Sequence, residues 1–326
     1  MRGKLSFTLL PILAVIFIIS CDSTTTTPGS AAVYFAWWDG EPPASYEPLV
    51  IAVAPLGGEF TAEEYPNVPF PQNREEYLAE IADCYEAGAV MAHILPVAGA
   101  PDTLGSLFDW TWDNYKYIID YLVENCPGML ISADISESFS SLEDSLEAYT
   151  PVNFVTPILG RYLYDGVWIG SDSPASTAAW VSGWQSGGLK VLPFIVSPQQ
   201  ADFLVRSLVQ SEYLQYPYHF PIAIGWEDNS ASTVEVFNTV INTLPDTAKF
   251  IVVCTGENPN ELMGLAIADG HHIRVGLKDA VYWPSGTYSP ISSTAFMVQK
   301  AVELANQMNR SVATTSEAAV LMDAYR

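Results

Sequence analysis

The chain has 326 residues, of which 49% are hydrophobic, and it carries 37 acidic against 13 basic side chains. The net charge of −24 argues against nucleic acid or an anionic lipid face as a partner and is more typical of a surface kept soluble by its acids. The apolar content is sufficient for one large domain, or for one barrel of about 250 residues with an extension.

An export signal is predicted at the N-terminus. Two basic residues among the first four precede an apolar run over residues 9–19, and Ser20 then stands before Cys21. The run is shorter than the about 20 apolar residues that a permanent membrane-spanning helix needs. We therefore predict a cleaved signal peptide over residues 1–20.

The end of this signal, Ile-Ile-Ser-Cys over residues 18–21, resembles a bacterial lipobox, in which a diacylglycerol is attached to the cysteine. Residues 21–30 continue with the polar composition of a flexible tether. The prediction is lipidation of Cys21 and a place in the cell envelope, facing outside the cytoplasm, with the lipid as the only membrane contact. An ordinary secretory signal with an incidental cysteine is the alternative.

Eight apolar runs rich in Val and Ile predict parallel strands that are covered on both faces. Helical patterns separate most of them, the first after a capping signal at Asn73. This alternation favours a single (β/α)8 TIM-type barrel over residues 31–326, with residues 31–38 as an extra N-terminal element. The strands are expected at 50–54, 90–95, 129–133, 152–159, 191–196, 220–224, 250–254 and 273–277, and the helices at 74–87, 113–124, 174–185, 198–210, 233–243, 260–268 and 293–307.

The three cysteines that follow Cys21 are an odd, sparse set, which argues against a disulfide framework, and their spacing matches no zinc site. Cys84, Cys126 and Cys254 are therefore interpreted as small buried apolar residues. A single bridge in an oxidising compartment is the alternative. Two histidines, His271 and His272, are neighbours on a predicted strand, so they face opposite ways and do not suit one shared metal ion.

In a barrel of this kind the functional side chains lie at the carboxyl ends of the strands. The candidates at this end are mostly carboxylates, and their excess is the functional hint, although each one alone is also explained as a solvated loop charge. They are Glu59, His93, Asp134, Glu227, Asp228, Glu257, Lys278 and Asp279.

Three stretches resemble the beta-keto acid cleavage enzymes, whose best-known activity is 3-keto-5-aminohexanoate cleavage. The first is IAVAPLGGE over residues 51–59, and the second is GHHIRVGLKD over residues 270–279. The third comprises residues 298–305 and 313–318. Because they bracket residues 51–326, the resemblance also implies a barrel for this part of the chain.

The resemblance implies a definite chemistry. Family members bind zinc through a His-x-His pair on the second strand and a glutamate of the last motif, and they transfer an acyl group between a beta-keto acid and acetyl-CoA. The metal acts as a Lewis acid, while an Arg and an Asp assist the carbon–carbon step. These two roles fall on Arg274 and Asp279, and the substrate-binding glutamate falls on Glu59. A homo-oligomer is also implied by the resemblance.

The chain departs from this pattern at the metal site. His93 matches the first histidine, but Leu95 stands at the second and Lys278 stands at the glutamate. Since a catalytic zinc normally has three protein ligands, His93 is interpreted as vestigial and no cofactor is expected. Lys278 either replaces zinc as a fixed cation or reaches solvent from the rim. The residues retained at the catalytic positions fit either a working anion pocket or barrel architecture.

Three functional hypotheses follow. The first is a diverged member, enzyme or pseudoenzyme, that takes a small carboxylated or keto-acid ligand; export opposes the inherited reaction, because acetyl-CoA is a cytoplasmic cosubstrate. The second is a surface carbohydrate-active or carbohydrate-binding lipoprotein, in which Glu227 and either Glu257 or Asp279 form the acid pair, with tryptophans stacking on sugars. The third is an interaction module of the envelope.

Overall fold

The computed structural model of the protein describes residues of one compact unit, which covers residues 37–326. The predicted signal segment, Cys21, its tether and the extra element at residues 31–38 all lie outside the described residues. Within the described part of the chain, no helix is long and apolar enough to cross a membrane. The described residues are 47–57, 60–98, 108, 110–135, 151–164, 166–170, 173–226, 229–255, 259–283 and 289–324.

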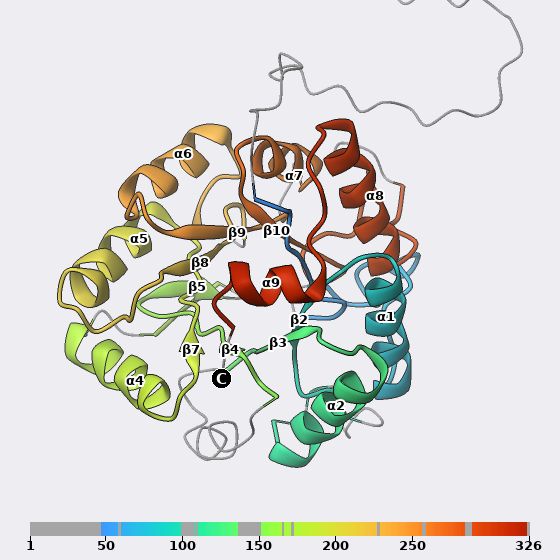
Figure 1. Cartoon of the computed structure of the whole chain (residues 1–326), viewed down its shortest axis with the longest axis horizontal. Helices are drawn as coiled ribbons and strands as arrows, with labels where there is room; N and C mark the ends of the chain where they lie inside the picture. Colours follow the sequence, from blue (N-terminus) through green and yellow to red (C-terminus); the bar gives the residue numbers. More distant parts are fainter. Residues whose placement is uncertain are drawn as a thin grey trace, which may run out of the picture. The chain divides into compact units, whose positions relative to one another are not determined.

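A curled sheet of eight parallel strands forms the centre of this unit (Figure 1), in the order β7-β4-β3-β2-β1-β10-β9-β8. Its two edges meet just beyond β7, where Ile195 N donates to Pro221 O and Ala223 N donates to Ile195 O, both at 2.8 Å. All eight predicted strands are present, and the fold is TIM-barrel-like. The strands are β1 (Ile51–Val53), β2 (Met91–Ile94), β3 (Leu130–Ala133), β4 (Phe154–Val155), β7 (Lys190–Val191), β8 (His219–Ile222), β9 (Lys249–Val253) and β10 (His272–Val275).

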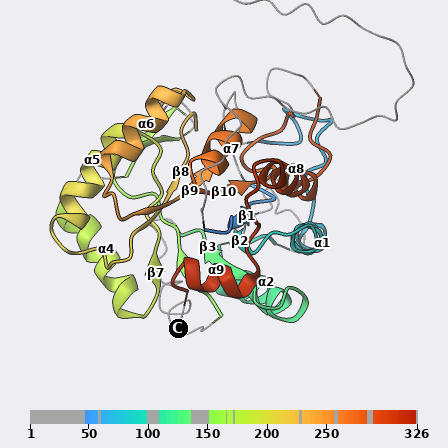
Figure 2. The ribbon, with the colours of Figure 1, turned by 45° about the horizontal axis from the view of Figure 1, so that its top comes forward.

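Helices surround the sheet, as Figures 1 and 2 show from two directions. The seven predicted helices are all present, and the fourth continues from α5 into a π-helical turn, η1 (Val205–Val209). The helices are α1 (Arg74–Glu86), α2 (Trp112–Asn125), α4 (Pro174–Ser186), α5 (Pro198–Leu204), α6 (Val234–Thr243), α7 (Pro259–Ala268), α8 (Thr294–Gln307) and α9 (Thr315–Leu321).

Helix α9, which the sequence did not reveal as a separate element, lies across one end of the barrel (Figures 1 and 2). Its Ala318 and the following Met322 are buried in one apolar cluster with Val50, Val90 and Leu130, which stand at the amino ends of the first three strands. Helix α9 therefore closes the amino-terminal end, and the carboxyl end of the strands remains for a ligand site.

A second unpredicted element is an antiparallel hairpin after β4, formed by β5 (Tyr162–Tyr164) and β6 (Val167–Ile169). The three residues of β6 are all exposed, so they give none of the apolar-polar alternation by which a half-buried strand is recognised. Within the predicted strand over residues 152–159, only Phe154 and Val155 pair as β4. The residues that follow them turn toward the pocket described below, which Thr156 and Ile158 line.

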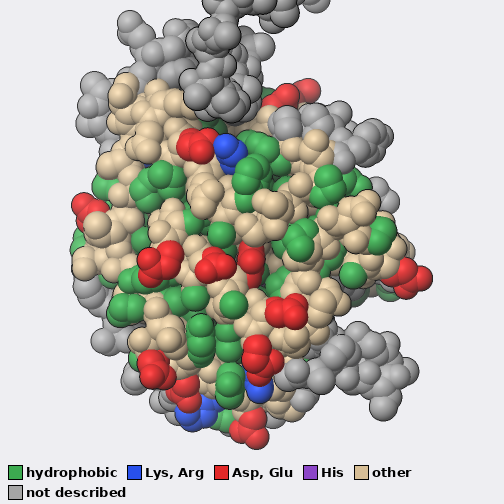
Figure 3. Space-filling model, turned by 90° about the vertical axis from the view of Figure 1, so that its right-hand side faces the viewer, with side chains coloured by type: hydrophobic (Ala, Val, Ile, Leu, Met, Phe, Trp, Pro, Cys, Tyr) green, Lys and Arg blue, Asp and Glu red, His purple; other side chains and the backbone are tan. Residues whose placement is uncertain are grey.

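The surface and the cysteines agree with the composition. Figure 3 shows Asp and Glu side chains scattered over one face of the molecule, among few Lys and Arg. Cys84, Cys126 and Cys254 are free and buried, which confirms their interpretation as apolar core residues.

The Asn73 cap provides a test of local stability. Asn73 accepts a hydrogen bond from Glu76 N at 2.9 Å at the start of α1, as the sequence predicted. Asn73→Ala should lower the free energy of unfolding by about 1 kcal/mol, whereas Asn73→Ser keeps an acceptor without placing a charge beside Glu76 and should change it less. Urea denaturation measures both, and equal stabilities of the two variants would contradict the capping role.

Candidate functional site

A pocket opens at the carboxyl end of the barrel strands. It encloses about 270 Å³ of empty space, part of which joins the solvent. Because part of this space is open solvent, the enclosed part suits only a small molecule. Its lining consists of His93, Asp134, Thr156, Ile158, Phe194, Trp226, Arg274 and Lys278.

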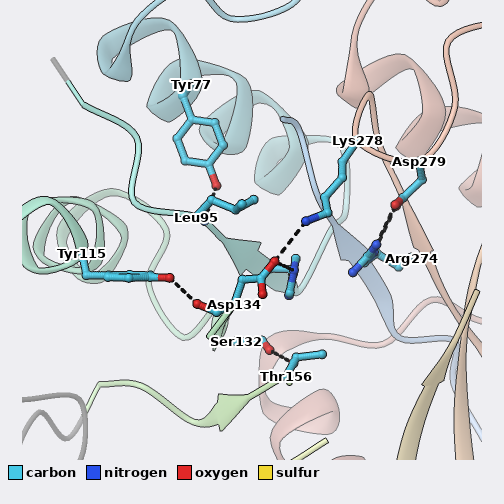
Figure 4. Close-up of polar contacts among 10 residues, drawn as sticks. Tyr77, Leu95, Tyr115, Ser132, Asp134, Thr156, Arg274, Lys278 and Asp279 are labelled. Carbon is cyan, nitrogen blue, oxygen red and sulfur yellow. Dashed lines mark hydrogen bonds and ion pairs between the residues drawn. The ribbon is translucent and has the colours of Figure 1, made fainter. Parts of the chain in front are cut away.

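Asp134 stands at the centre of the polar contacts (Figure 4). Its Oδ2 lies 3.3 Å from His93 Nε2 and 3.0 Å from Lys278 Nζ. The Asp134 backbone is fixed as well, because its N donates to Ile94 O at 3.0 Å and its carbonyl accepts from the Tyr115 hydroxyl. Lys278 is only 9% exposed, so its ammonium group points into the pocket and does not reach out to solvent.

The protonation states follow from burial and charge. Burial acts to raise the pKa of Asp134, but the Lys278 ammonium and the hydrogen bond from His93 outweigh it and hold this pKa well below its usual range. Burial, together with the Arg274 cation and against the pull of Asp134, lowers the pKa of His93 to about 4. At neutral pH the carboxylate is therefore ionised and the imidazole neutral. Because an ionised carboxylate only accepts, His93 Nε2 must carry the proton.

Arg274 and Asp279 form a second, bidentate ion pair. Arg274 Nε donates to Asp279 Oδ2 at 3.0 Å, and Nη2 donates to Oδ1 at 2.6 Å. Both side chains are buried, and the guanidinium carbon lies 5.0 Å from the centre of the Phe194 ring. The pair thus fixes the guanidinium at the pocket wall.

Gly276 explains how the last motif builds this wall. Its φ of 155° is unfavourable for other residues, and a Cβ there would lie 2.1 Å from Ala54 O. Only glycine lets β10 end so close to β1. The turn is then closed by Lys278 N, which donates to Ala54 O at 3.1 Å, and by Asp279 N, which donates to Gly276 O at 3.0 Å.

Two of the positions that the family resemblance assigns to zinc ligands hold other side chains, Leu95 and Lys278. Position 95 offers a hydrocarbon, and the Lys278 ammonium has no lone pair for a metal while it binds Asp134. Among the described residues, no group of three or more His, Cys, Asp or Glu side chains could hold a metal ion.

The structure brings together some of the candidates and leaves others aside. His93, Asp134, Arg274 and Lys278 share the pocket, and Asp279 supports it through Arg274. Glu59, Glu227, Asp228 and Glu257 lie outside the described residues. Three lining residues were not singled out from the sequence, because they lie near the ends of apolar runs and resemble core residues. They are Thr156, Ile158 and Phe194.

The other histidines lie at the opposite end of the barrel. His219 and His272 begin β8 and β10, and His272 Nδ1 accepts a hydrogen bond from Val50 N at 3.2 Å. The His271 ring instead packs edge-on against Phe250, with centroids 5.1 Å apart. The two neighbouring histidines thus face opposite ways, as predicted.

His219 should make the fold sensitive to acid. Neither ring nitrogen has a hydrogen-bond partner among the described residues, and burial, helped by the ammonium groups of Lys190 and Lys249, lowers its pKa to about 3. In the unfolded chain the His219 imidazole takes up a proton near pH 6.5, whereas in the folded protein it stays neutral down to about pH 3. The stability that depends on a neutral His219 is therefore fully present above pH 6.5 and is lost as the pH falls toward 3. Between pH 7.5 and 5 the loss should be about 2 kcal/mol.

Urea denaturation at these two pH values measures this loss. A His219→Phe variant removes the titrating group and should show that much less pH dependence. The same dependence in both proteins would contradict the assignment.

A curled parallel sheet ringed by helices, with its pocket at the carboxyl ends of the strands, places the protein among the TIM-barrel-like α/β proteins. Solved structures agree at the level of fold. Apo ObcA matches with a TM-score of 0.63 and 16% identity, over 78% of this chain and 65% of that one. The binary complex of ObcA with oxaloacetate matches with a TM-score of 0.62 and 14% identity, over 78% and 67%. This chain thus spans just under two thirds of apo ObcA.

The chain belongs to the beta-keto acid cleavage enzyme family, whose model matches residues 48–323. It is similar to the 3-keto-5-aminohexanoate cleavage enzyme of Acetoanaerobium sticklandii, with 28% identity over 279 residues, which are 83% of this chain and 97% of the relative. The enzyme of the same name from Fusobacterium nucleatum subsp. nucleatum is 25% identical over 278 residues, 83% of this chain and 96% of the relative. The resemblance that the three motifs indicated is thereby confirmed.

Proposed function

We propose that the protein is a lipid-anchored envelope barrel whose pocket takes a small carboxylated or beta-keto compound without a metal ion. Membership of the beta-keto acid cleavage family supports the class of ligand. The observation that carries the metal-free part is the contact of Lys278 Nζ with Asp134 at 3.0 Å, since a fixed ammonium stands where the family pattern has a metal ligand. Both a diverged enzyme and a pseudoenzyme fit this proposal.

Two cations would recognise the ligand. Arg274 and Lys278 both line the pocket, and charge-assisted hydrogen bonds to a carboxylate are among the stronger contacts available to them. A guanidinium has more N–H donors than the two that Asp279 accepts, so Arg274 can donate to a ligand while it keeps its partner. His93 is neutral and donates to Asp134, which keeps a further positive charge out of the pocket.

The inherited acyl transfer is not part of the proposal, because the predicted export separates the protein from cytoplasmic acetyl-CoA. The alternative of a carbohydrate-active or carbohydrate-binding protein is not part of the proposal either. Of its carboxylates, Asp279 is committed to Arg274, whereas Glu227 and Glu257 lie outside the described residues. A homo-oligomer stays a prediction.

The test combines metal analysis with ligand binding to the purified full chain. Acetoacetate should raise the melting temperature equally before and after treatment with EDTA, because a ligand that binds only the folded state stabilises it. Lys278→Met should weaken binding at least tenfold, and Lys278→Arg should weaken it less. Lys300→Met, which removes an ammonium from the α8 surface, is the matched control and should bind as the wild type does. Stoichiometric zinc, or binding lost with EDTA, would sink the proposal.

The anchor is tested separately. Wild-type protein should partition into the detergent phase and carry the mass of a diacylglycerol at Cys21, whereas Cys21→Ser should remain in the aqueous phase. Aqueous partitioning of both proteins would contradict lipidation.

A further inference from the structure

The pocket has two chemically different halves. One half is charged or polar and comes from β2, from β10 and from the residues that follow β3 and β10. The other half is apolar and comes from the segments that follow β4, β7 and β8. The first half consists of His93, Asp134, Arg274 and Lys278, and the second of Ile158, Phe194 and Trp226. The eighth lining residue, Thr156, follows β4, and its hydroxyl is hydrogen-bonded to that of Ser132.

The strand order makes each half continuous. Strands β3, β2, β1 and β10 are successive neighbours in the sheet, so the charged side chains arise from one arc. Strands β4 and β7 are also neighbours, and the bridge between Ile195 and Ile222 places the segment after β7 beside β8. The apolar side chains therefore form a second arc, opposite the first.

The apolar arc is firmly built. Phe194 and Trp226 are 6% and 8% exposed and belong to one buried cluster, against which Ile158 and Tyr162 pack. The Tyr162 ring, on the β5–β6 hairpin, lies 6.0 Å from the Trp226 ring.

The side chain of Asn229 fixes this hairpin through both amide atoms. It accepts from Leu163 N at 2.7 Å and donates to Leu163 O at 2.8 Å. The hairpin thus backs the apolar arc as a fixed wall.

From this division we infer that the site selects acids whose far end is an uncharged hydrocarbon tail, and that it rejects the same acids when the tail carries an amine. The inference rests on the proposed function. A carboxylate held by Arg274 and Lys278 directs the rest of a small ligand toward the facing arc. A tail that lies on Ile158, Phe194 and Trp226 gains from burial. An ammonium there would lose its water and find no opposite charge among the described side chains of this arc.

The names of two relatives provide the comparison for the tail. The two relatives bear the name of a six-carbon keto acid that carries an amine at its fifth carbon. The apolar arc therefore indicates a specificity that differs from the one their names describe.

Three keto acids test this on the full chain by titration calorimetry: acetoacetate, 3-oxohexanoate and 3-keto-5-aminohexanoate. The second should bind about tenfold more tightly than the first, because it buries two further methylene groups. The third differs from the second by the amine alone and should bind at least tenfold more weakly. Equal affinities for acetoacetate and 3-oxohexanoate, or a preference for the amine, would overturn the inference while the proposed function stands. Failure of all three to bind would overturn the proposed function.

Variants locate the effect. Ile158→Ala should reduce the advantage of 3-oxohexanoate over acetoacetate, and Ile158→Asp should reverse the preference between the uncharged and the amine-bearing acid. Val320→Ala and Val320→Asp serve as the controls, because Val320 is 61% exposed on α9 and does not line the pocket, so the ratios should stay unchanged. Unaltered ratios in both Ile158 variants would count against the apolar arc as the tail site.

Discussion

Arg274→Met should lower the free energy of unfolding by about 3–5 kcal/mol. The Arg274 and Asp279 side chains are 5% and 3% exposed and are joined by hydrogen bonds of 3.0 and 2.6 Å. Methionine fills a similar volume, but it leaves the Asp279 carboxylate buried without its guanidinium partner. Urea denaturation at neutral pH measures the loss.

Two further variants show that the pair is the cause. Arg274→Met combined with Asp279→Leu should recover much of the stability, because an apolar pair can replace a buried ion pair at little cost. Arg274→Lys should fall between the wild type and Arg274→Met, since an ammonium cannot reproduce the bidentate contact. An Arg274→Met protein within 1 kcal/mol of the wild type would show that the pair adds little to the fold.

The double variant also separates two interpretations that the sequence leaves open. If Arg274 and Asp279 are only barrel architecture, the stable double variant should bind acetoacetate as the wild type does. If Arg274 also holds the ligand, that variant should fold and fail to bind. The proposed function requires the second result.

The strands and helices could be predicted because apolar runs and caps are local signals. All eight runs became strands, and the Asn73 cap formed as expected. The strand ends could not be predicted in the same way. The run over residues 152–159 is buried or half-buried throughout, yet only Phe154 and Val155 form the ladder, while Ile158 makes a single bridge to Phe194 and lines the pocket. An apolar run indicates that its residues are buried, but it does not show whether they pair with a neighbouring strand or line a pocket.

The site was less predictable because its contacts are long-range. Lys278 binds Asp134, which lies 144 positions away in the chain. The sequence around a lysine at a strand end does not show whether its side chain reaches solvent or a carboxylate. Two residues of the apolar lining gave no separate signal either, since Ile158 and Phe194 lie in apolar runs like those of core residues. The signals that did point to the pocket were the motif at residues 270–279, through Arg274 and Lys278, and the strand-end positions of His93 and Asp134.

The replaced positions change the charge of the pocket more than its shape. A zinc ion would bring two positive charges, whereas Lys278 brings one, which Asp134 largely offsets at 3.0 Å. In the proposed metal-free pocket the cations would still attract a carboxylate, but no strong Lewis acid would act on it. The proposed export would separate the protein from the cosubstrate of the family reaction, so both proposals favour binding over the inherited transfer.

Rebuilding the ligands should therefore restore the metal. A Leu95→His/Lys278→Glu protein should retain about one zinc ion per chain after dialysis, whereas the wild type should retain none. Residues 93 and 95 are two apart on an extended segment, so both imidazoles would point to the same side, and the new glutamate would remove the cation that binds Asp134. Metal analysis measures the uptake. Zinc at one hundred times its dissociation constant should also stabilise the double variant by about 2.7 kcal/mol, and EDTA should reverse this. Leu95→His alone keeps Lys278 and should bind far less. Zinc retained by the wild type, or none retained by the double variant, would show that positions 95 and 278 do not decide metal binding in this barrel.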